Sequence, residues 1–271
     1  MADGSYRTPG GAPAPDPSRV AELAAALAPS PDFAAAEESL ANEALSRLAQ
    51  AAKTRGQDCA DLLADIRSRL SRLSPQGLVP RRGLAGLFDG RGKRLKAFRT
   101  AFNGGSAALA NALAGLGERA ETGAGRTVDL DSLAHDLRAA VSALAEQVAA
   151  ARERLAQAAS GDEGIEAFRA RTEVLEARLA ATVRALPLVR ALQNADARTR
   201  DALTGAPKAI EAWQADWKTQ LGLDGKRPRR VRPAPEALSP ARDKIEIALA
   251  RIETEQAAAA QRRQEIARRL A

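Results

Sequence analysis

The longest regular pattern of apolar positions runs from Gly164 to Asn194 and predicts a long helix. Apolar residues and threonines recur there in alternating steps of three and four, which places them on one stripe of an α-helix. The stripe consists of Ile165, Phe168, Thr172, Leu175, Leu179, Thr182, Leu186 and Val189. A stripe this narrow needs partner helices to cover it. Pro187 lies off the stripe and cannot donate a hydrogen bond to Val183, so it predicts a kink.

A second long helix is predicted from Asp129 to Ser160. Leucines recur there every eleven residues, a period typical of nearly straight or slightly right-handed helix packing. The repeats are Leu133, Leu144 and Leu155, followed in step by Leu137 and Val148. Gly161-Asp162 predicts a short turn, so the two long helices should form an antiparallel hairpin.

Glycine and proline divide the rest of the chain into shorter predicted helices. Ser30 and Pro31 indicate an N-cap and first position of a helix that carries Phe33, Leu40, Ala44 and Leu48 on one face. Glycines weaken the helix that opens at Lys93, and they predict a loop over residues 115–125. Gly205-Ala206-Pro207 predicts a further break. The shorter predicted helices cover residues 18–28, 31–56, 58–74, 93–102, 195–221 and 241–271.

These patterns predict an all-α fold, an elongated bundle with long antiparallel coiled-coil-like helices. We expect a disordered N-terminus over residues 1–17, a helical domain over 18–221, a basic Pro-rich linker over 222–240 and a C-terminal helix over 241–271. That last helix should open at Pro240 or Ala241. Its seam turns polar at Gln256 and Arg263, so we expect it to be either frayed or a weak docking surface.

Composition favours long helices packed through small side chains and argues against an ordinary globular core. Aromatic residues make up 3% of the chain, so a thick aromatic core is not expected. Trp213 and Trp217 lie four apart on one helix face, which is more typical of a packing anchor than of a ligand site. The single cysteine, Cys59, is in step with Ile66 and Leu70 and should be a buried apolar residue.

The candidate chemistry outside the arginines is sparse. One cysteine and one histidine, His135, cannot form a His/Cys metal site within one chain. The chain contains none of the common nucleotide-binding, nucleophile or zinc motifs. We therefore expect no cofactor and no enzymatic activity. We also expect a cytoplasmic protein, because no stretch resembles a signal peptide or a transmembrane helix.

The net charge of +7 is concentrated in two basic patches on a mildly acidic remainder. Residues 81–99 hold seven basic residues and one acid, and residues 226–232 hold five basic residues and no acid. The candidate anion- or partner-binding residues are Arg81, Arg82, Arg91, Lys93, Arg94, Lys96, Arg99, Lys226, Arg227, Arg229, Arg230 and Arg232.

Such patches could bind phosphates of nucleic acid, anionic lipid headgroups or an acidic partner. They are equally consistent with a solvated arginine surface. Aromatic residues that would stack on bases are few in these patches, which makes nucleic acid the weaker alternative. Leu84, Leu87 and Phe88 beside the first patch suit a membrane interface better.

An ordered series of segments resembles the TelA-like toxic anion resistance family, which is associated with tellurite resistance in bacteria. The closest match is LPLVRALQN, Leu186 to Asn194, in which Pro187 stands where the family pattern places a proline. Gln193 and Asn194 in this segment are candidate structural residues, as are Pro187, Trp213 and Trp217. The other segments are LSRLSP from Leu70, LVPRRGLAGLF from Leu78, the basic start at Lys93, DLDSLAHDL from Asp129 and AIEAWQADWK from Ala209.

The resemblance covers about residues 56–221 and identifies a shortened, divergent member. It implies a cytoplasmic helical protein that protects against toxic oxyanions or envelope stress, and a peripheral location at the inner membrane is the alternative to a purely cytoplasmic one. Protection would act through protein partners, self-association through helices, or an anionic membrane surface. The resemblance supplies no catalytic residues.

Overall fold

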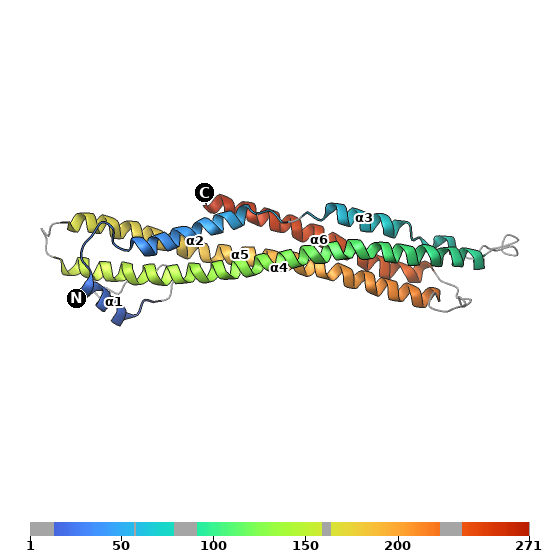
Figure 1. Ribbon diagram of the computed structural model, residues 1–271, viewed down its shortest axis with the longest axis horizontal. Coiled ribbons are helices and arrows are strands. Elements are labelled where there is room, and N and C mark those ends of the chain that lie inside the picture. The colour runs from blue at the N-terminus through green and yellow to red at the C-terminus, as the bar shows by residue number, and fades with distance from the viewer. Residues whose placement is uncertain (1–13, 57, 79–90, 159–163, 223–234, 271) are drawn as a thin grey trace. The chain divides into compact units, whose positions relative to one another are not determined.

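The computed structural model describes residues 14–56, 58–78, 91–158, 164–222 and 235–270, and these residues form helices and no strands. The all-α prediction is therefore confirmed for them (Figure 1). The elements in chain order are α1 (Pro17–Ala26), α2 (Ala35–Lys53), α3 (Ala60–Ser71), a short 3-10 helix η1 (Pro75–Leu78), α4 (Arg91–Gln157), α5 (Ile165–Leu221) and α6 (Pro235–Leu270).

The chain divides into two compact units, each assembled from separated segments. Unit 1 contains residues 1–55, 127–194 and 262–271, and unit 2 contains residues 56–126 and 195–261. Helices α4, α5 and α6 therefore contribute residues to both units. Each unit has its own hydrophobic core.

Unit 1 contains the predicted antiparallel hairpin of α4 and α5. The Nε atom of Arg152 lies 2.6 Å from a carboxylate oxygen of Glu176, and the Gln193 amide donates to Asp131 at 2.6 Å. Late residues of α4 thus meet early residues of α5, and the reverse, which defines an antiparallel pair. The predicted turn at Gly161-Asp162 lies outside the described residues.

The predicted stripe of α5 faces the core of unit 1. Seven of its eight residues are buried, and the eighth, Leu186, is half-buried. The two threonines are buried without losing hydrogen bonds, because Thr172 donates to the Phe168 carbonyl and Thr182 to the Arg178 carbonyl. The eleven-residue repeat of α4 is likewise buried, except that Leu155 at its end is half-buried.

Helix α2 covers the hairpin of unit 1, but it begins later than predicted. Ser30 does not cap it: its hydroxyl accepts a hydrogen bond from Asp32, closing a turn, and α2 starts after Ala34, whose φ is +54°. The buried face of α2 is Ala41, Ala44, Leu48 and Ala52. Leu40, predicted on that face, is 58% exposed, and its neighbour Ala41, three residues before Ala44, is buried in its place.

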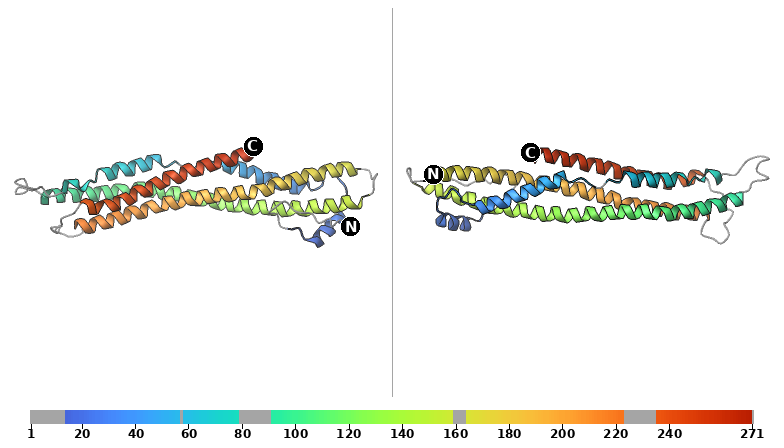
Figure 2. Two further views of the ribbon diagram at one scale, coloured as in Figure 1. Left: turned by 180° about the vertical axis from the view of Figure 1, so that it is seen from behind. Right: turned by 45° about the horizontal axis from the view of Figure 1, so that its top comes forward.

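Small elements complete unit 1. Val20 and Ala24 of α1 pack on Ala149 and Ala150 of α4. The end of α6 packs beside α2, since Ile266 belongs to the cluster that contains Leu48 (Figure 2).

The glycine-rich part of α4 is helical, so the loop predicted over residues 115–125 is wrong. Two of the glycines provide room in unit 2 for α3 and for Leu73, which follows it. A Cβ atom at Gly105 would lie 2.9 Å from Leu73 Cδ1, and one at Gly115 would lie 3.1 Å from Leu62 Cδ1. Burial of Leu109 and Leu116 on the same helix offsets the loss of about 1 kcal/mol of helix propensity per glycine.

The break predicted at Gly205-Ala206-Pro207 is also absent, because α5 continues to Leu221. Its buried face runs through this segment as Leu203, Ala206 and Ile210. Tertiary packing of that face therefore outweighs the local cost of glycine and proline. Pro187 likewise lies inside the uninterrupted helix, and its ring is exposed to solvent, away from the core.

Helix α6 begins at Pro235 and contains Pro240, so its predicted start at Pro240 or Ala241 is too late. Proline suits the first helical position, and Leu238, three residues later, is fully buried. The seam of α6 is packed, not frayed, in this structure: Arg263 is 7% exposed, and the Gln256 amide contacts Cys59 Sγ at 3.1 Å.

Candidate partner-binding groove

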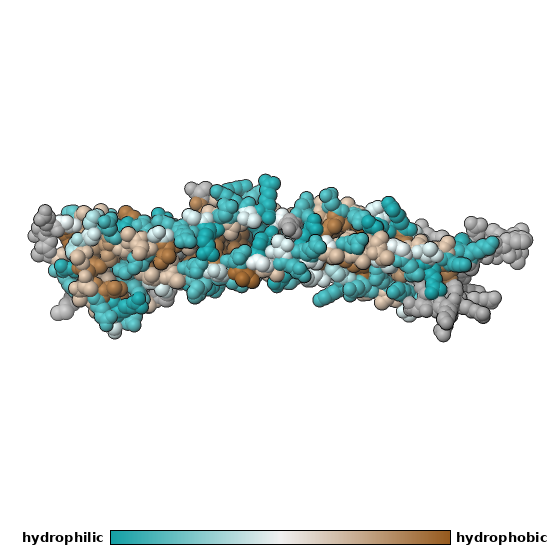
Figure 3. Space-filling model, viewed as in Figure 1, coloured by the Kyte–Doolittle hydropathy of each residue, from teal (hydrophilic) through white to brown (hydrophobic). Residues whose placement is uncertain are grey.

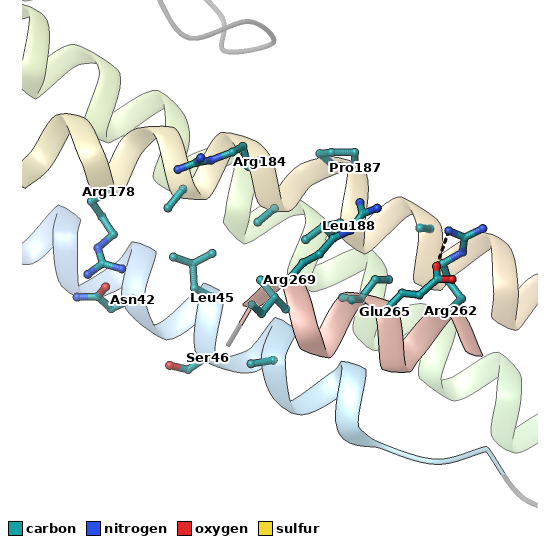
Figure 4. A pocket seen from close by; sticks show the side chains of 16 residues that line it. Asn42, Leu45, Ser46, Arg178, Arg184, Pro187, Leu188, Arg262, Glu265 and Arg269 are labelled. Atoms are coloured by element: carbon teal, nitrogen blue, oxygen red, sulfur yellow. Dashed lines mark hydrogen bonds and ion pairs between the residues drawn. The ribbon is translucent and has the colours of Figure 1, made fainter. Parts of the chain in front are cut away.

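A groove in unit 1 lies between α2, α5 and the last turns of α6 (Figure 4). Its volume is about 1040 Å³. Nine of its sixteen lining residues are apolar, five are charged, and Asn42 and Ser46 are polar. The apolar residues are Leu45, Ala49, Ala181, Ala185, Pro187, Leu188, Ala191, Ile266 and Leu270, and the charged ones are Arg178, Arg184, Arg262, Arg269 and Glu265.

Small side chains explain why the groove is hollow. Four of the nine apolar positions are alanines, three of them on α5, so the helix surfaces carry little volume where they face each other. Leu45 and Leu188 are half-buried, and Pro187, Arg184 and Arg269 are exposed. The cavity is therefore a surface groove with an apolar floor rather than an enclosed hole.

Some of the charges around the groove neutralise each other. Arg262 contacts Glu265 at 3.0 Å, an interaction drawn in Figure 4. Arg178 lies 3.9 Å from Glu38, which also accepts a hydrogen bond from Arg171 at 2.5 Å.

Two groove arginines carry a charge that no described carboxylate neutralises. Arg184 donates from Nε to the Ala180 carbonyl of its own helix, and Arg269 lies near the end of α6. Among the described residues, neither has a carboxylate within ion-pair distance. With four arginines and one glutamate, the lining is electropositive over an apolar floor.

The first basic patch lies partly at the start of α4 in unit 2. Lys93 and Lys96 are exposed, and Arg94 and Arg99 are half-buried, while Phe98 turns toward the core. The first turn of α4 contains no acid, so the positive end of the helix dipole adds to these charges. Arg91 opens α4, but its side chain lies outside the described part of the structure.

The remaining predicted patch residues lie outside the described ranges. These residues are Arg81, Arg82, Lys226, Arg227, Arg229, Arg230 and Arg232. None of the predicted patch residues lines the groove.

The two tryptophans form a packing anchor, as their spacing predicts. Both are 1% exposed in the core of unit 2. Trp213 packs against Phe102 with ring centroids 5.3 Å apart, and Trp217 lies 6.2 Å from Phe98. Trp217 Nε1 donates to the Leu238 carbonyl at 3.1 Å, whereas Trp213 Nε1 has no acceptor among the described residues.

The other candidate structural residues have different surroundings. Gln193 holds α5 to α4 through Asp131, and Asn194 is exposed. Pro187 lines the groove. Its sequence position predicted a role in helix geometry, and its place on the groove wall was not foreseen.

Cys59 is buried at the start of α3, which confirms the prediction from its spacing. Burial raises the pKa of its thiol, which keeps it protonated and weakly nucleophilic at neutral pH. His135 is exposed on α4. The described residues contain no group of three or more His, Cys, Asp or Glu side chains that could hold a metal ion.

The groove itself was missed by sequence reasoning. Its arginines are spread over residues 178–184 and 262–269 and do not form one continuous basic run, whereas the search was for runs of basic residues. The available signal was the pairing of arginine with alanine-rich helix faces.

Comparison with known proteins gives no match: no family model, no curated protein and no solved structure matches the chain. Within the described residues, no helix is long and apolar enough to cross a membrane.

Proposed function

We propose that the protein is a non-enzymatic helical binding protein of the toxic anion resistance type, which acts in stress or envelope protection through contacts with a protein or a membrane surface. The observation that carries the binding role is the groove of unit 1. It combines nine apolar residues with four arginines in one surface.

The chemistry of this lining favours binding over catalysis. Arginine remains protonated at physiological pH and does not serve as a proton donor or acceptor. Alanine, leucine, isoleucine and proline offer contact area and no reactive group. Such a surface holds a ligand by burial of apolar area and by charge-assisted hydrogen bonds.

The toxic anion role is supported by the segment resemblance. The segment that most closely resembles the TelA-like family, Leu186 to Asn194, supplies Pro187, Leu188 and Ala191 to the groove. We therefore assign the protective role to partner binding at this surface. The single cysteine makes an intramolecular disulfide impossible and suits a reducing compartment, so we propose a cytoplasmic protein that can lie at the inner face of the membrane.

A growth assay tests this proposal. We expect a strain that lacks the gene to grow poorly on tellurite, and the full chain to restore growth. The variant Arg184→Glu/Arg269→Glu should fail to restore it, whereas Arg190→Glu, an exposed arginine of the same helix outside the groove, should succeed. Normal growth of the deletion strain would refute the resistance role. Full rescue by the double variant would refute the groove as its site.

A further inference from the structure

We propose that the groove binds an acidic amphipathic helix of a partner protein. This inference rests on the proposed function, because it names the occupant of the same surface. It follows from the length, the floor and the charge of the groove.

The groove is long enough to hold a short helix. Its wall on α5 extends from Arg178 to Ala191, thirteen steps of about 1.5 Å each and therefore about 20 Å in total. A partner helix of about four turns has this length. The walls on α2 and α6, Asn42–Ala49 and Arg262–Leu270, are shorter, so the partner helix would lie along α5.

The floor suits apolar side chains from one helix face. Ala181, Ala185 and Ala191 follow one another along α5, while Leu45 and Ile266 lie on the other two helices. A helix laid in such a groove inserts apolar residues at positions i, i+3 or i+4, and i+7. The alanines leave space for these larger side chains, and the half-buried Leu45 and Leu188 would lose further solvent exposure.

The charge of the partner follows from the arginines. Glu265 is already paired with Arg262, so the groove offers a positive edge at Arg184 and Arg269, neither of which lies within ion-pair distance of a described carboxylate. Arginine binds carboxylates through two parallel hydrogen bonds, and a positive patch meets a negative one in complementary interfaces. Glutamate or aspartate beside the apolar face of the partner helix would supply these contacts.

Two other classes of ligand fit the groove less well. Nucleic-acid bases stack on aromatic side chains, and none of the sixteen lining residues is aromatic. A membrane surface is planar at this scale and would reach the exposed arginines but not the recessed floor. Both classes are outcomes of the test.

The test selects helical peptides against the full-length chain. The probe is a displayed library of peptides of about 16 residues, or about four turns, with leucine fixed at one face and glutamate, lysine or glutamine varied beside it. We expect the selected pool to be rich in glutamate, and the selected peptide to bind about tenfold or more weakly to Arg184→Glu/Arg269→Glu. Arg190→Glu should bind as the parent chain does.

Two alanine-to-leucine variants test the contribution of the apolar floor to peptide binding independently of the arginines. Ala181→Leu fills the floor and should block peptide binding, whereas Ala177→Leu, exposed on the same helix outside the groove, should not. Circular dichroism and thermal unfolding of each variant check that it folds. Gel filtration with light scattering reports a second copy in the groove as a dimer lost in Ala181→Leu.

The outcomes are distinct. Selection of lysine-rich peptides, selection of no peptide, equal binding to Ala181→Leu, or a groove-dependent dimer would each overturn the acidic-helix proposal. Binding of duplex DNA or of phosphatidylglycerol vesicles through Arg184 and Arg269 would replace it with another ligand class. The growth assay does not depend on peptides, so the two tests can fail separately. If Arg184→Glu/Arg269→Glu fails to restore growth but no acidic peptide is selected, the acidic helix is refuted as the ligand and the proposed function of the groove stands.

Discussion

The two units of this protein use the same long helices but fill their interiors in different ways. Unit 2 encloses Trp213, Trp217 and Phe102, with Phe98 packed against them. Unit 1 relies on alanine, leucine and valine, and its aromatic pair, Phe33 and Phe168, lies at one end with ring centroids 5.5 Å apart. Large side chains close the spaces between helices in unit 2, whereas small ones leave a groove in unit 1.

The residues that stabilise the fold differ from those that are available to bind a partner. Fully buried aromatic residues in unit 2 stabilise the fold and offer no surface to a partner. The groove residues of unit 1 are half-buried or exposed, apart from Ala185 and Ile266. On the face shown in Figure 3, apolar patches are small and separated by hydrophilic side chains. The groove, in contrast, brings nine apolar residues together in one place.

The largest effect should come from emptying the aromatic core of unit 2. Trp213→Ala removes a side chain that is 1% exposed and should lower the free energy of unfolding by about 3–5 kcal/mol. Urea denaturation followed by circular dichroism measures this loss. A loss below about 1 kcal/mol would contradict the closed core.

A conservative pair sharpens this result. Trp217→Phe removes the hydrogen bond to the Leu238 carbonyl and should cost more than Trp213→Phe, whose indole nitrogen has no acceptor among the described residues. The reverse order would contradict the hydrogen-bond assignment.

The next effect should come from the polar contacts of unit 1. Arg171 donates to the Phe33 carbonyl at 2.9 Å and to Glu38 at 2.5 Å, and both charged side chains are mostly buried. Arg171→Leu should cost about 1.5–3 kcal/mol, because it leaves Glu38 poorly satisfied. Arg169→Leu, in an exposed pair with Glu166, is the control and should cost below about 0.5 kcal/mol. Equal losses in thermal unfolding would refute the distinction.

Replacing an exposed glycine of α4 should have a smaller effect, and it should raise the free energy of unfolding. A Cβ atom at Gly117 meets nothing within 4 Å, so Gly117→Ala should stabilise the protein by about 0.5–1 kcal/mol through helix propensity. Gly105→Ala should gain less or lose stability, because the added Cβ would lie 2.9 Å from Leu73 Cδ1. Urea midpoints decide the order. A larger gain at Gly105 would show that Leu73, just after α3, does not approach α4 as described.

The smallest effect concerns pH. The hydrogen bond from Arg67 lowers the pKa of Glu253. Its stabilisation is therefore complete above the unfolded pKa and is lost as the pH falls through the lower folded value. Both side chains are substantially exposed, so Glu253→Gln should cost only about 0.2–1 kcal/mol at pH 7, and less below about pH 4. Unfolding of both proteins across this range measures the difference, which Arg67→Met should abolish. A difference that grows on acidification would contradict the sign.

Patterns of spacing predicted the buried faces of the long helices well. The three-and-four stripe of α5, the eleven-residue repeat of α4 and the seam of α6 are nearly all buried. Burial follows periodicity because each helix presents one face to its neighbours. The tryptophan anchor and buried Cys59 followed from the same reasoning.

Helix boundaries and breaks could not be predicted from local signals. Glycine and proline raise the local cost of helix, but the costs in α4 and α5 are offset by contacts with residues far away in the chain, such as Leu73 against Gly105. The start of α6 also depends on a distant partner, since Leu238 is held by Trp217. The groove is still harder to predict from local signals, because its three walls come from distant segments of the chain. The walls on α2 and α5 are separated by well over a hundred residues.

Selection of an acidic helix by the groove of unit 1 should depend on Arg184 and Arg269. The most direct measurement is a charge-swap titration by fluorescence anisotropy, with a glutamate-flanked leucine helix and its lysine-flanked counterpart. The parent chain should prefer the glutamate peptide, and Arg184→Glu/Arg269→Glu should prefer the lysine peptide. Unchanged preference in the double variant would contradict the claim.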